Sequence, residues 1–172
     1  ASENLPDPQL GWVLLNRSGG HPDSVERSVI RRWKAADSGT AKIQGTLSHG
    51  SPNGDGVRGR IIINQSTTAG SWEIKKGSID TNLDDIQINK GDLVDFVTES
   101  IESHTSDSFN WPVAIKLVNS ASKVITIQSE SDFSGPEESV NVIPGQIERA
   151  WQLIYQRQPS DNEMDRACRF IA

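Results

Sequence analysis

The chain has 172 residues and a formal net charge of −6. This length fits one domain of ordinary size with an appendage, and it buries a core without disulfides. The acidic balance argues against nucleic acid as the main partner, because phosphate binding requires clustered Lys and Arg. No apolar run reaches the roughly 20 residues that span a membrane, so we expect no membrane insertion.

Basic side chains nevertheless gather at two places in the first third of the chain. The members of these groups are Arg27, Arg31, Arg32 and Lys34, and then Arg58 and Arg60. Such groups form either a solvated face or a site for an anionic ligand, and the sequence leaves both interpretations open.

Short apolar runs separated by turn residues fill the chain from Gly11 to Val118, a pattern typical of an all-β domain. We expect strands at residues 12–15, 29–34, 40–47, 57–64, 71–75, 85–88, 93–98 and 111–118, with one more at 124–127. Residues 89–92, Asn-Lys-Gly-Asp, predict a tight turn between two of them. Strands at this spacing predict two packed antiparallel sheets over residues 1–128.

Alternation along the strand at 57–64 assigns its two faces. Val57, Gly59, Ile61 and Ile63 share one face, and Arg58, Arg60, Ile62 and Asn64 share the other. The two arginines are therefore expected to point to the same side of one sheet.

The amino-acid composition and the spacing of apolar residues change after residue 128. Residues 129–143 are rich in Ser and Glu and are expected to form a linker. Residues 144–172 predict a helical hairpin, whose first helix has Pro144 near its start and apolar residues at helical spacing. These apolar residues are Ile147, Ala150, Trp151 and Ile154.

The second helix of this tail is predicted from its start signal. Gln158 and Pro159 end the first helix, and Ser160 with Glu163 forms the S-x-x-E pattern of a capping box. Its apolar stripe consists of Met164, Ala167, Cys168 and Ile171. Cys168 is the only cysteine, so no disulfide forms within the chain, and we expect it to be a small packing residue.

Catalytic signatures are absent from the sequence: it has no G-x-S-x-G elbow, no H-E-x-x-H helix and no P-loop. The histidines, at positions 21, 49 and 104, fall in expected loops without metal-ligand spacing. We therefore predict no catalytic residue, no cofactor and no metal site of the histidine type.

Residues 53–56, Asn-Gly-Asp-Gly, resemble part of a calcium loop but lack its later oxygen ligands. They form either a structural turn or, together with Ser106 and Asp107, a structural calcium site. The sequence leaves both possibilities open.

Five tryptophans in a small β domain are a feature of sugar-binding surfaces, because an exposed indole stacks on the apolar face of a sugar ring. Trp12 and Trp33 lie in apolar strands and are expected in the core, and Trp151 is expected to pack in its helix. Trp72 and Trp111 adjoin polar stretches and are the better candidates for sugar contact.

A set of motifs in this order resembles the β-sandwich module of large secreted planctomycete proteins that carry a cytochrome c-like domain. The motifs cover residues 5–12, 19–22, 30–33, 45–49, 54–61, 91–97 and 106–111. The tail around Arg157, Gln158, Pro159 and Ser160 resembles a helical segment of the same proteins.

The resemblance implies a jelly-roll-type, galactose-binding-like sandwich that binds polysaccharide and docks to other domains of its parent protein. It also implies an extracellular, periplasmic or cell-envelope location. The chain begins at Ala1 rather than Met, and we expect it to be a piece of such a longer protein. It contains no C-x-x-C-H motif, so we expect no haem.

Three functional hypotheses follow. The first is a non-catalytic module for a polysaccharide, possibly a sulfated or uronic one, with a site formed by His49, Asp55, Arg58, Arg60, Trp72, Asp107 and Trp111. Its physical alternative is that Arg58 pairs with Asp95 or Asp107 and only braces the sandwich. The second hypothesis is a structural or interaction module. The third, a glycosidase or lyase, requires paired carboxylates, and Asp84 and Asp85 are strand neighbours that face opposite ways.

Overall fold

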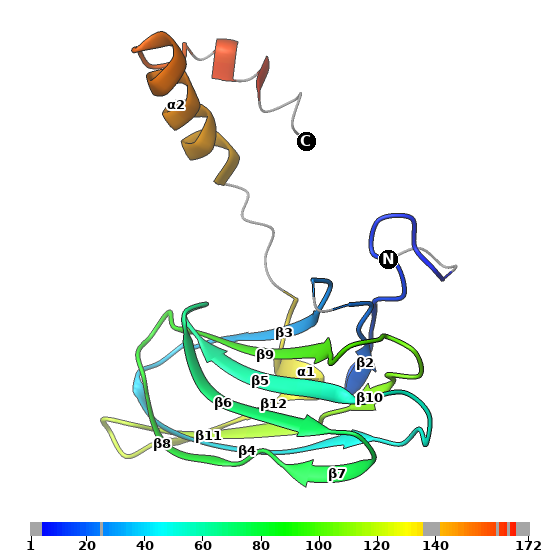
Figure 1. Cartoon of the computed structure of the whole chain (residues 1–172). Helices are drawn as coiled ribbons and strands as arrows, with labels where there is room; N and C mark the ends of the chain where they lie inside the picture. Colours follow the sequence, from blue (N-terminus) through cyan, green and yellow to red (C-terminus); the bar gives the residue numbers. More distant parts are fainter. Residues whose placement is uncertain (1–4, 25, 136–141, 161, 165, 168–172) are drawn as a thin grey trace. The chain divides into compact units, whose positions relative to one another are not determined.

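The computed structural model describes residues 5–24, 26–135, 142–160, 162–164 and 166–167. The chain divides into two compact units, Ala1–Pro136 and Glu137–Ala172. The first unit contains the strands and the second contains the long helix (Figure 1).

Two antiparallel sheets build the first unit. The smaller has the order β3 (Val29–Lys34), β9 (Leu93–Ser100), β5 (Val57–Ile63) and β6 (Thr67–Ile74). The larger has the order β1 (Leu14–Leu15), β2 (Gly19–His21), β10 (Phe109–Asn110), β4 (Gly39–His49), β11 (Val113–Asn119) and β12 (Val124–Gln128). Two further strands, β7 (Gly77–Asp80) and β8 (Leu83–Ile88), pair with the free side of β4.

Strand β4 is the centre of the larger sheet. Its first half pairs with β11 and β8, and its second half pairs with β10 and β7. Its side chains alternate strictly: Ala41, Ile43, Leu47 and His49 are buried, whereas Lys42, Gln44 and Thr46 are exposed. This period of two is what a sheet with one wet face requires.

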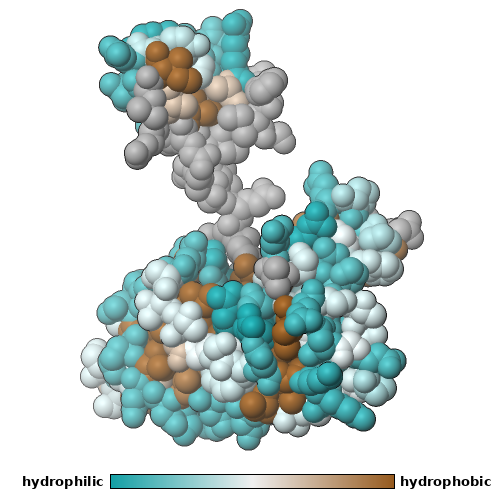
Figure 2. Space-filling model, in the orientation of Figure 1, coloured by the Kyte–Doolittle hydropathy of each residue, from teal (hydrophilic) through white to brown (hydrophobic). Residues whose placement is uncertain are grey.

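One hydrophobic core lies between the sheets and draws on both. Strands β3, β5 and β9 contribute from the smaller sheet, and β4, β8, β11 and β12 from the larger. The face of this unit seen in Figure 2 is correspondingly mostly hydrophilic, with apolar residues confined to narrow strips.

Trp111 lies at the centre of this core, fully buried between β10 and β11. Its ring meets the ring of Phe96 edge-on, with centroids 5.6 Å apart, and its Nε1–H donates to Thr81 Oγ1 at 2.8 Å. A Cβ at Gly59 would stand 3.1 Å from the indole and 2.8 Å from Leu47. A side chain at position 59 would therefore push the two sheets apart.

The expected strands of the first unit are all present, and the face assignment on β5 is confirmed, with Val57, Gly59 and Ile61 buried. The turn at 89–92 is confirmed by the bond from Asp92 N–H to Asn89 O, 3.0 Å. The short strands β2, β7 and β10 were not predicted. They have two to four residues each, too few to show a period.

The region expected as a linker begins within the first unit. Ser129–Asp132 form α1, and the ring of Phe133 lies 4.9 Å from that of Phe96. Ser134 exchanges two backbone hydrogen bonds with Arg32, at 2.6 and 2.8 Å. The first unit therefore continues past residue 128, because Phe133 packs against its core.

The second unit contains α2 (Val142–Tyr155), which matches the first predicted helix except that Pro144 is its third residue. The capping box is confirmed: Ser160 N–H donates to Glu163 Oε2 at 2.8 Å, and Glu163 N–H lies 3.4 Å from Ser160 Oγ. Residues 162–164 and 166–167 are helical, while Cys168 and Ile171 lie outside the described residues.

Hydrogen bonds to Arg157 and Ser160 lower the pKa of Glu163 to about 2. Within the described part of the chain, none of the helices has both the length and the apolar character to cross a bilayer.

Replacing Trp111 by Ala is expected to cost about 3–5 kcal/mol of unfolding free energy, because it leaves a cavity between the sheets and an unpaired Thr81 hydroxyl. Trp12→Ala is the matched control, since Trp12 is 42% exposed, and it should cost under about 1 kcal/mol. Urea unfolding measures both. Equal losses would contradict the central position of Trp111.

Candidate functional site

The outer face of the larger sheet presents a row of polar side chains along β4. The outward positions are Thr40, Lys42, Gln44, Thr46 and Ser48. They supply hydroxyl, amide and ammonium groups at every second residue of one extended strand. This row is flanked by β7 and β8 on one side and by β10 and β11 on the other.

Three hollows follow this row. The first, about 380 Å³, surrounds the middle of β4 and is lined by Gln44, Thr46, Asp80, Asn82 and Gln128 together with residues 112–114. The second, about 620 Å³, lies beside Lys42, and the third, about 340 Å³, shares Thr40 and Val118 with the second. The first hollow shares no lining residue with the other two, so the three form a row rather than one continuous cleft. They follow residues 39–46 of β4, which span about 24 Å in extended conformation. We call this row of hollows the β4 groove.

Exposed apolar side chains line part of the β11–β12 side of the β4 groove. Val118 on β11 and Val124 on β12 are directly paired, and they are 43% and 58% exposed. Pro112 and Ala114 lie along the first hollow. Two polar side chains, Lys116 on β11 and Gln128 on β12, share this side, so it is mixed, whereas the β4 side is polar.

Charges within the groove are largely balanced. Lys42 Nζ lies 2.7 Å from Asp84 Oδ1, and this contact raises the pKa of Lys42. Thr46 Oγ1 donates to Asp80 Oδ1 at 3.0 Å, and Gln87 Nε2 donates to Thr40 Oγ1 at 3.2 Å. Each of these groups keeps further hydrogen-bonding capacity toward solvent.

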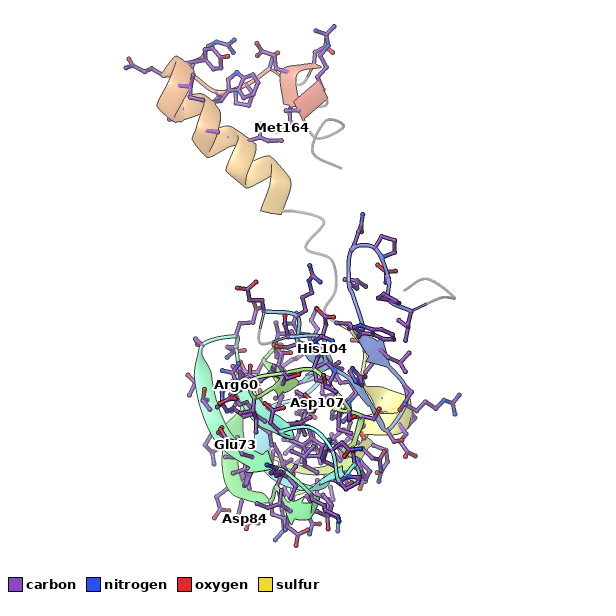
Figure 3. The ribbon with its side chains drawn as sticks, turned by 45° about the vertical axis from the view of Figure 1, so that its right-hand side comes forward. Arg60, Glu73, Asp84, His104, Asp107 and Met164 are labelled. Carbon is purple, nitrogen blue, oxygen red and sulfur yellow. The ribbon has the colours of Figure 1, made fainter. Side chains whose placement is uncertain are left out.

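Arg58 and Arg60, expected to share a face of one strand, do lie together on the outer side of the smaller sheet. Arg60 Nη2 and Arg58 Nη1 both bind the carboxylate of Glu99, at 2.8 and 3.1 Å, and Arg58 also binds Glu73 at 2.7 Å. These partners, Glu73 first, raise the pKa of Arg58. Figure 3 shows Arg60 and Glu73 on this side of the unit. The arginines brace the sheet, although their partners are glutamates and not the predicted Asp95 or Asp107.

His49, Asp55 and Asp107 meet at one end of the sheets, as the sequence predicted for converging loops. They are not a surface site: the side chains of His49 and Asp107 have no exposure to solvent. His49 Nδ1 lies 2.7 Å from Lys75 O and Nε2 lies 2.8 Å from Ser106 O. A direct role of His49 and Asp107 in sugar contact is therefore wrong for this structure.

Trp111 is likewise wrong as a stacking surface, because its indole is fully buried. Trp72 stands on β6 opposite Gly59, so its side chain points inward, and its ring covers Gly70 and packs against the core. Conversely, Trp12 was expected in the core but is 42% exposed. The apolar run around Trp12 forms only the two-residue edge strand β1, and Trp12 itself lies in the preceding turn, where Asp23 accepts its backbone N–H at 2.8 Å.

The first basic group does not converge on one ligand. Arg27 pairs with Asp23 at 3.1 Å, and Arg32 forms two hydrogen bonds to Asp95 at 2.7 and 2.8 Å. Arg31 is buried and donates to the carbonyls of Arg17 and Trp111, and burial lowers the pKa of its guanidinium to about 10. These arginine side chains form hydrogen bonds and ion pairs that stabilise the first unit.

Sequence reasoning missed the β4 groove. The alternation of polar and apolar residues at 39–49 is visible in the sequence and predicts a wet face. The positions of Val118 opposite Thr40 and of Asp80 opposite Thr46 depend on which strands neighbour β4, which the sequence alone does not show.

No family model and no curated protein matches this chain. A solved structure described as a family 35 carbohydrate binding module from an environmental isolate is similar to it, with a TM-score of 0.38 and 15% sequence identity. The similarity covers 72% of this chain and 85% of that one. A likeness of this size does not establish a shared function.

Glu99 is only 6% exposed and binds two arginines, so Glu99→Gln should lower the unfolding free energy by about 1–3 kcal/mol by leaving both guanidinium groups undercompensated. The control is Glu73→Gln in the same network, because its side chain is 53% exposed, and it should cost under about 1 kcal/mol. Urea unfolding at constant ionic strength compares them. A larger loss from Glu73→Gln would contradict the assignment of Glu99 as the anchor.

Proposed function

We propose that this chain is a non-catalytic carbohydrate-binding module and that a polysaccharide lies along the β4 groove. The observation that carries the proposal is the row of hollows along β4, which combines hydroxyl and amide groups with the exposed apolar side chains of Val118 and Val124.

This arrangement suits the chemistry of a sugar chain. A pyranose ring has hydroxyl groups at its edge and C–H groups on its faces. Thr46, Gln44 and Gln128 match the hydroxyls with donors and acceptors, while Val118 and Val124 match the C–H faces. An extended groove of about 24 Å accommodates several consecutive rings, and each ring adds modest contacts.

A neutral glycan fits this groove better than a sulfated or uronic one. The anionic preference rested on Arg58 and Arg60, and both are already bound to Glu99. An anionic sugar would have to displace that carboxylate. In the groove, Lys42 and Lys116 line the same hollow as Asp84 and Asp85, and Lys42 is paired with Asp84, so the positive charges there are balanced.

The proposal of a binding module rather than an enzyme rests on where the carboxylates lie. Glycoside hydrolysis needs two accessible carboxyl groups on either side of the scissile bond. Asp107 is fully buried and out of reach of a sugar chain. Asp84 and Asp85 were expected to face opposite ways, but both line the second hollow, because the backbone of Asp85, at φ +59°, departs from the extended conformation. Asp84 is paired with Lys42 at 2.7 Å.

Following the resemblance in the sequence, we extend the proposal to a parent protein outside the cytoplasm. There the module would hold neighbouring domains close to a polysaccharide.

Affinity electrophoresis tests the function. The chain should be retarded in gels that contain a soluble neutral β-glucan, mannan or xylan, and less retarded with a sulfated polysaccharide. Gln44→Ala combined with Gln128→Ala should weaken binding at least about 5-fold, because two hydrogen-bonding groups are lost from one hollow. Gln152→Ala, an exposed glutamine on α2, is the matched control. Unretarded migration with every polysaccharide in the panel would overturn the proposal.

A second candidate function, a docking module, is favoured by the surface of α2. Ile154 and Tyr155, the last two residues of this helix, are 70% and 56% exposed. Tyr155 is also held in place, with Trp151 at 5.2 Å and the Arg157 guanidinium 5.9 Å from its ring centroid. An ordered exposed aromatic of this kind suits contact with another domain.

Chemical cross-linking of the full-length gene product tests this candidate. Docking predicts cross-links from α2 to a neighbouring domain, which Ile154→Asp should reduce at least about 5-fold, while Gln152→Asp on the same helix should leave them unchanged. Equal cross-linking in wild type and Ile154→Asp would eliminate docking through this surface.

A further inference from the structure

The carboxylate of Asp107 is the most unusual polar group of the first unit. It lies in the loop between β9 and β10 and has no solvent exposure. Neither of its oxygens accepts a hydrogen bond from any residue in the described part of the chain. A buried carboxylate left in this state costs several kcal/mol unless a proton or a cation compensates it.

Asp55 also has a buried carboxylate oxygen that accepts no hydrogen bond from the described residues. Asp55, in the loop between β4 and β5, uses Oδ2 to accept the backbone N–H groups of Glu102 and Ser103 at 2.6 and 3.0 Å. Its other oxygen, Oδ1, is buried and bonds to none of the described residues. The loop after β9 is thereby fixed to the loop after β4, while one carboxylate oxygen of Asp55 and both of Asp107 remain without a hydrogen bond among the described residues.

Neutral oxygens complete the cluster. The hydroxyl of Ser100, at the end of β9, is buried and faces Asp107 without hydrogen-bonding geometry. The carbonyl oxygen of Thr105 and Asp107 Oδ1 lie 2.3 and 3.2 Å from the point where a Cβ at Gly54 would stand. Only a glycine fits at position 54, which has φ +86°, because a side chain there would clash with the Thr105 carbonyl, and this close approach brings the β4–β5 loop against the β9–β10 loop.

The electrostatics of the cluster favour a bound positive charge. Burial raises the pKa of Asp107, and the carboxylate of Asp55 adds to the rise, while Ser100, His49 and His21 act against it. Burial also opposes ionisation of Asp55, but the N–H groups of Ser103 and Glu102 hold its pKa below its usual value.

His49 does not neutralise the cluster by itself. Its Nε2 is 3.8 Å from Asp107 Oδ1, and that nitrogen is already directed at the carbonyl of Ser106. His49 therefore donates no hydrogen bond to either oxygen of Asp107.

We propose that Asp107, Asp55, Ser100 and the Thr105 carbonyl bind a calcium ion between the β4–β5 and β9–β10 loops. The available atoms are all oxygens, and Ca²⁺ takes carboxylate, carbonyl, hydroxyl and water oxygens in flexible geometry. Among the described residues, no three His, Cys, Asp or Glu side chains are grouped to hold a metal, which argues against a zinc-type site.

This site is separate from the β4 groove. Its ligands come from two loops and a strand end at one end of the sheets, and Asp107 lies inside the unit (Figure 3). The ion would fasten the two loops together and stabilise the sheets. Calcium binding and sugar binding can therefore fail independently of each other.

Calorimetry on the whole chain, stripped of metal with EDTA and dialysed, tests the proposal. Titration with CaCl2 should show one site, and 1 mM Ca²⁺ should raise the unfolding temperature by about 5 °C. Asp107→Asn and Asp55→Asn should each abolish both effects. Asp84→Asn, an exposed aspartate on β8, is the matched control and should keep them.

Three results would overturn the proposal. The first is no heat and no shift with Ca²⁺ in the wild type. The second is an equal shift with MgCl2, which would mean charge screening. The third is an unchanged response in Asp55→Asn, a partly exposed position that remains informative if Asp107→Asn does not fold. Retardation in polysaccharide gels is measured separately and does not affect these outcomes.

Discussion

The indole of Trp111 fills the space between the two sheets, and three separate segments hold this residue in place. Thr81 accepts its Nε1–H, Ser18 accepts its backbone N–H at 2.6 Å, and Arg31 donates to its carbonyl at 2.5 Å. Because a buried indole without a partner is costly, the turn between β7 and β8 cannot move without disturbing the core. The glycine at position 59 follows from the same constraint, since a large ring on one sheet requires a small residue on the other.

The position of Trp111 also creates the β4 groove. The chain leaves β10 at Trp111 and enters β11 at Val113, and on the other side of β4 it leaves β7 at Asp80 and enters β8 at Leu83. On both sides of β4, the neighbouring strand is therefore replaced by another near Gly45, whose carbonyl accepts the Thr81 N–H at 2.8 Å. The first hollow lies at this double change of partner, so the core and the proposed binding surface share one cause.

The sequence predicted those parts of the fold that depend on residues close together in the chain. Strand β5, the turn at 89–92 and the capping box at Ser160 and Glu163 each rest on residues within a few positions of one another. The sequence did not show which residues far apart in the chain come into contact. That Trp111 is buried and Trp12 exposed depends on which strand each residue adjoins, because Trp12 precedes a two-residue edge strand and Trp111 a central one. The convergence of Asp55 with Asp107 was predicted from the loops, but the depth of Asp107 was not, since it is set by packing between sheets.

The two outer faces of the first unit have opposite character. On the smaller sheet, Arg58, Arg60 and Glu99 bind one another and close the surface, and Arg32 with Asp95 does the same on the neighbouring strands. On the larger sheet the side chains of β4 remain open to solvent. Two arginines that already bind a buried carboxylate are a poor site for an anionic ligand, so the arginine pair noticed in the sequence is structural.

Strict alternation along β4 has a consequence for how this protein changes over time. Odd-numbered positions from Ala41 to His49 face the interior, and even-numbered positions from Thr40 to Ser48 face outward. Substitutions at the even positions alter the surface without touching the packing beneath. A single strand thus separates variation of the proposed binding surface from the requirements of folding, and a combinatorial library restricted to those five codons would vary that surface on an intact scaffold.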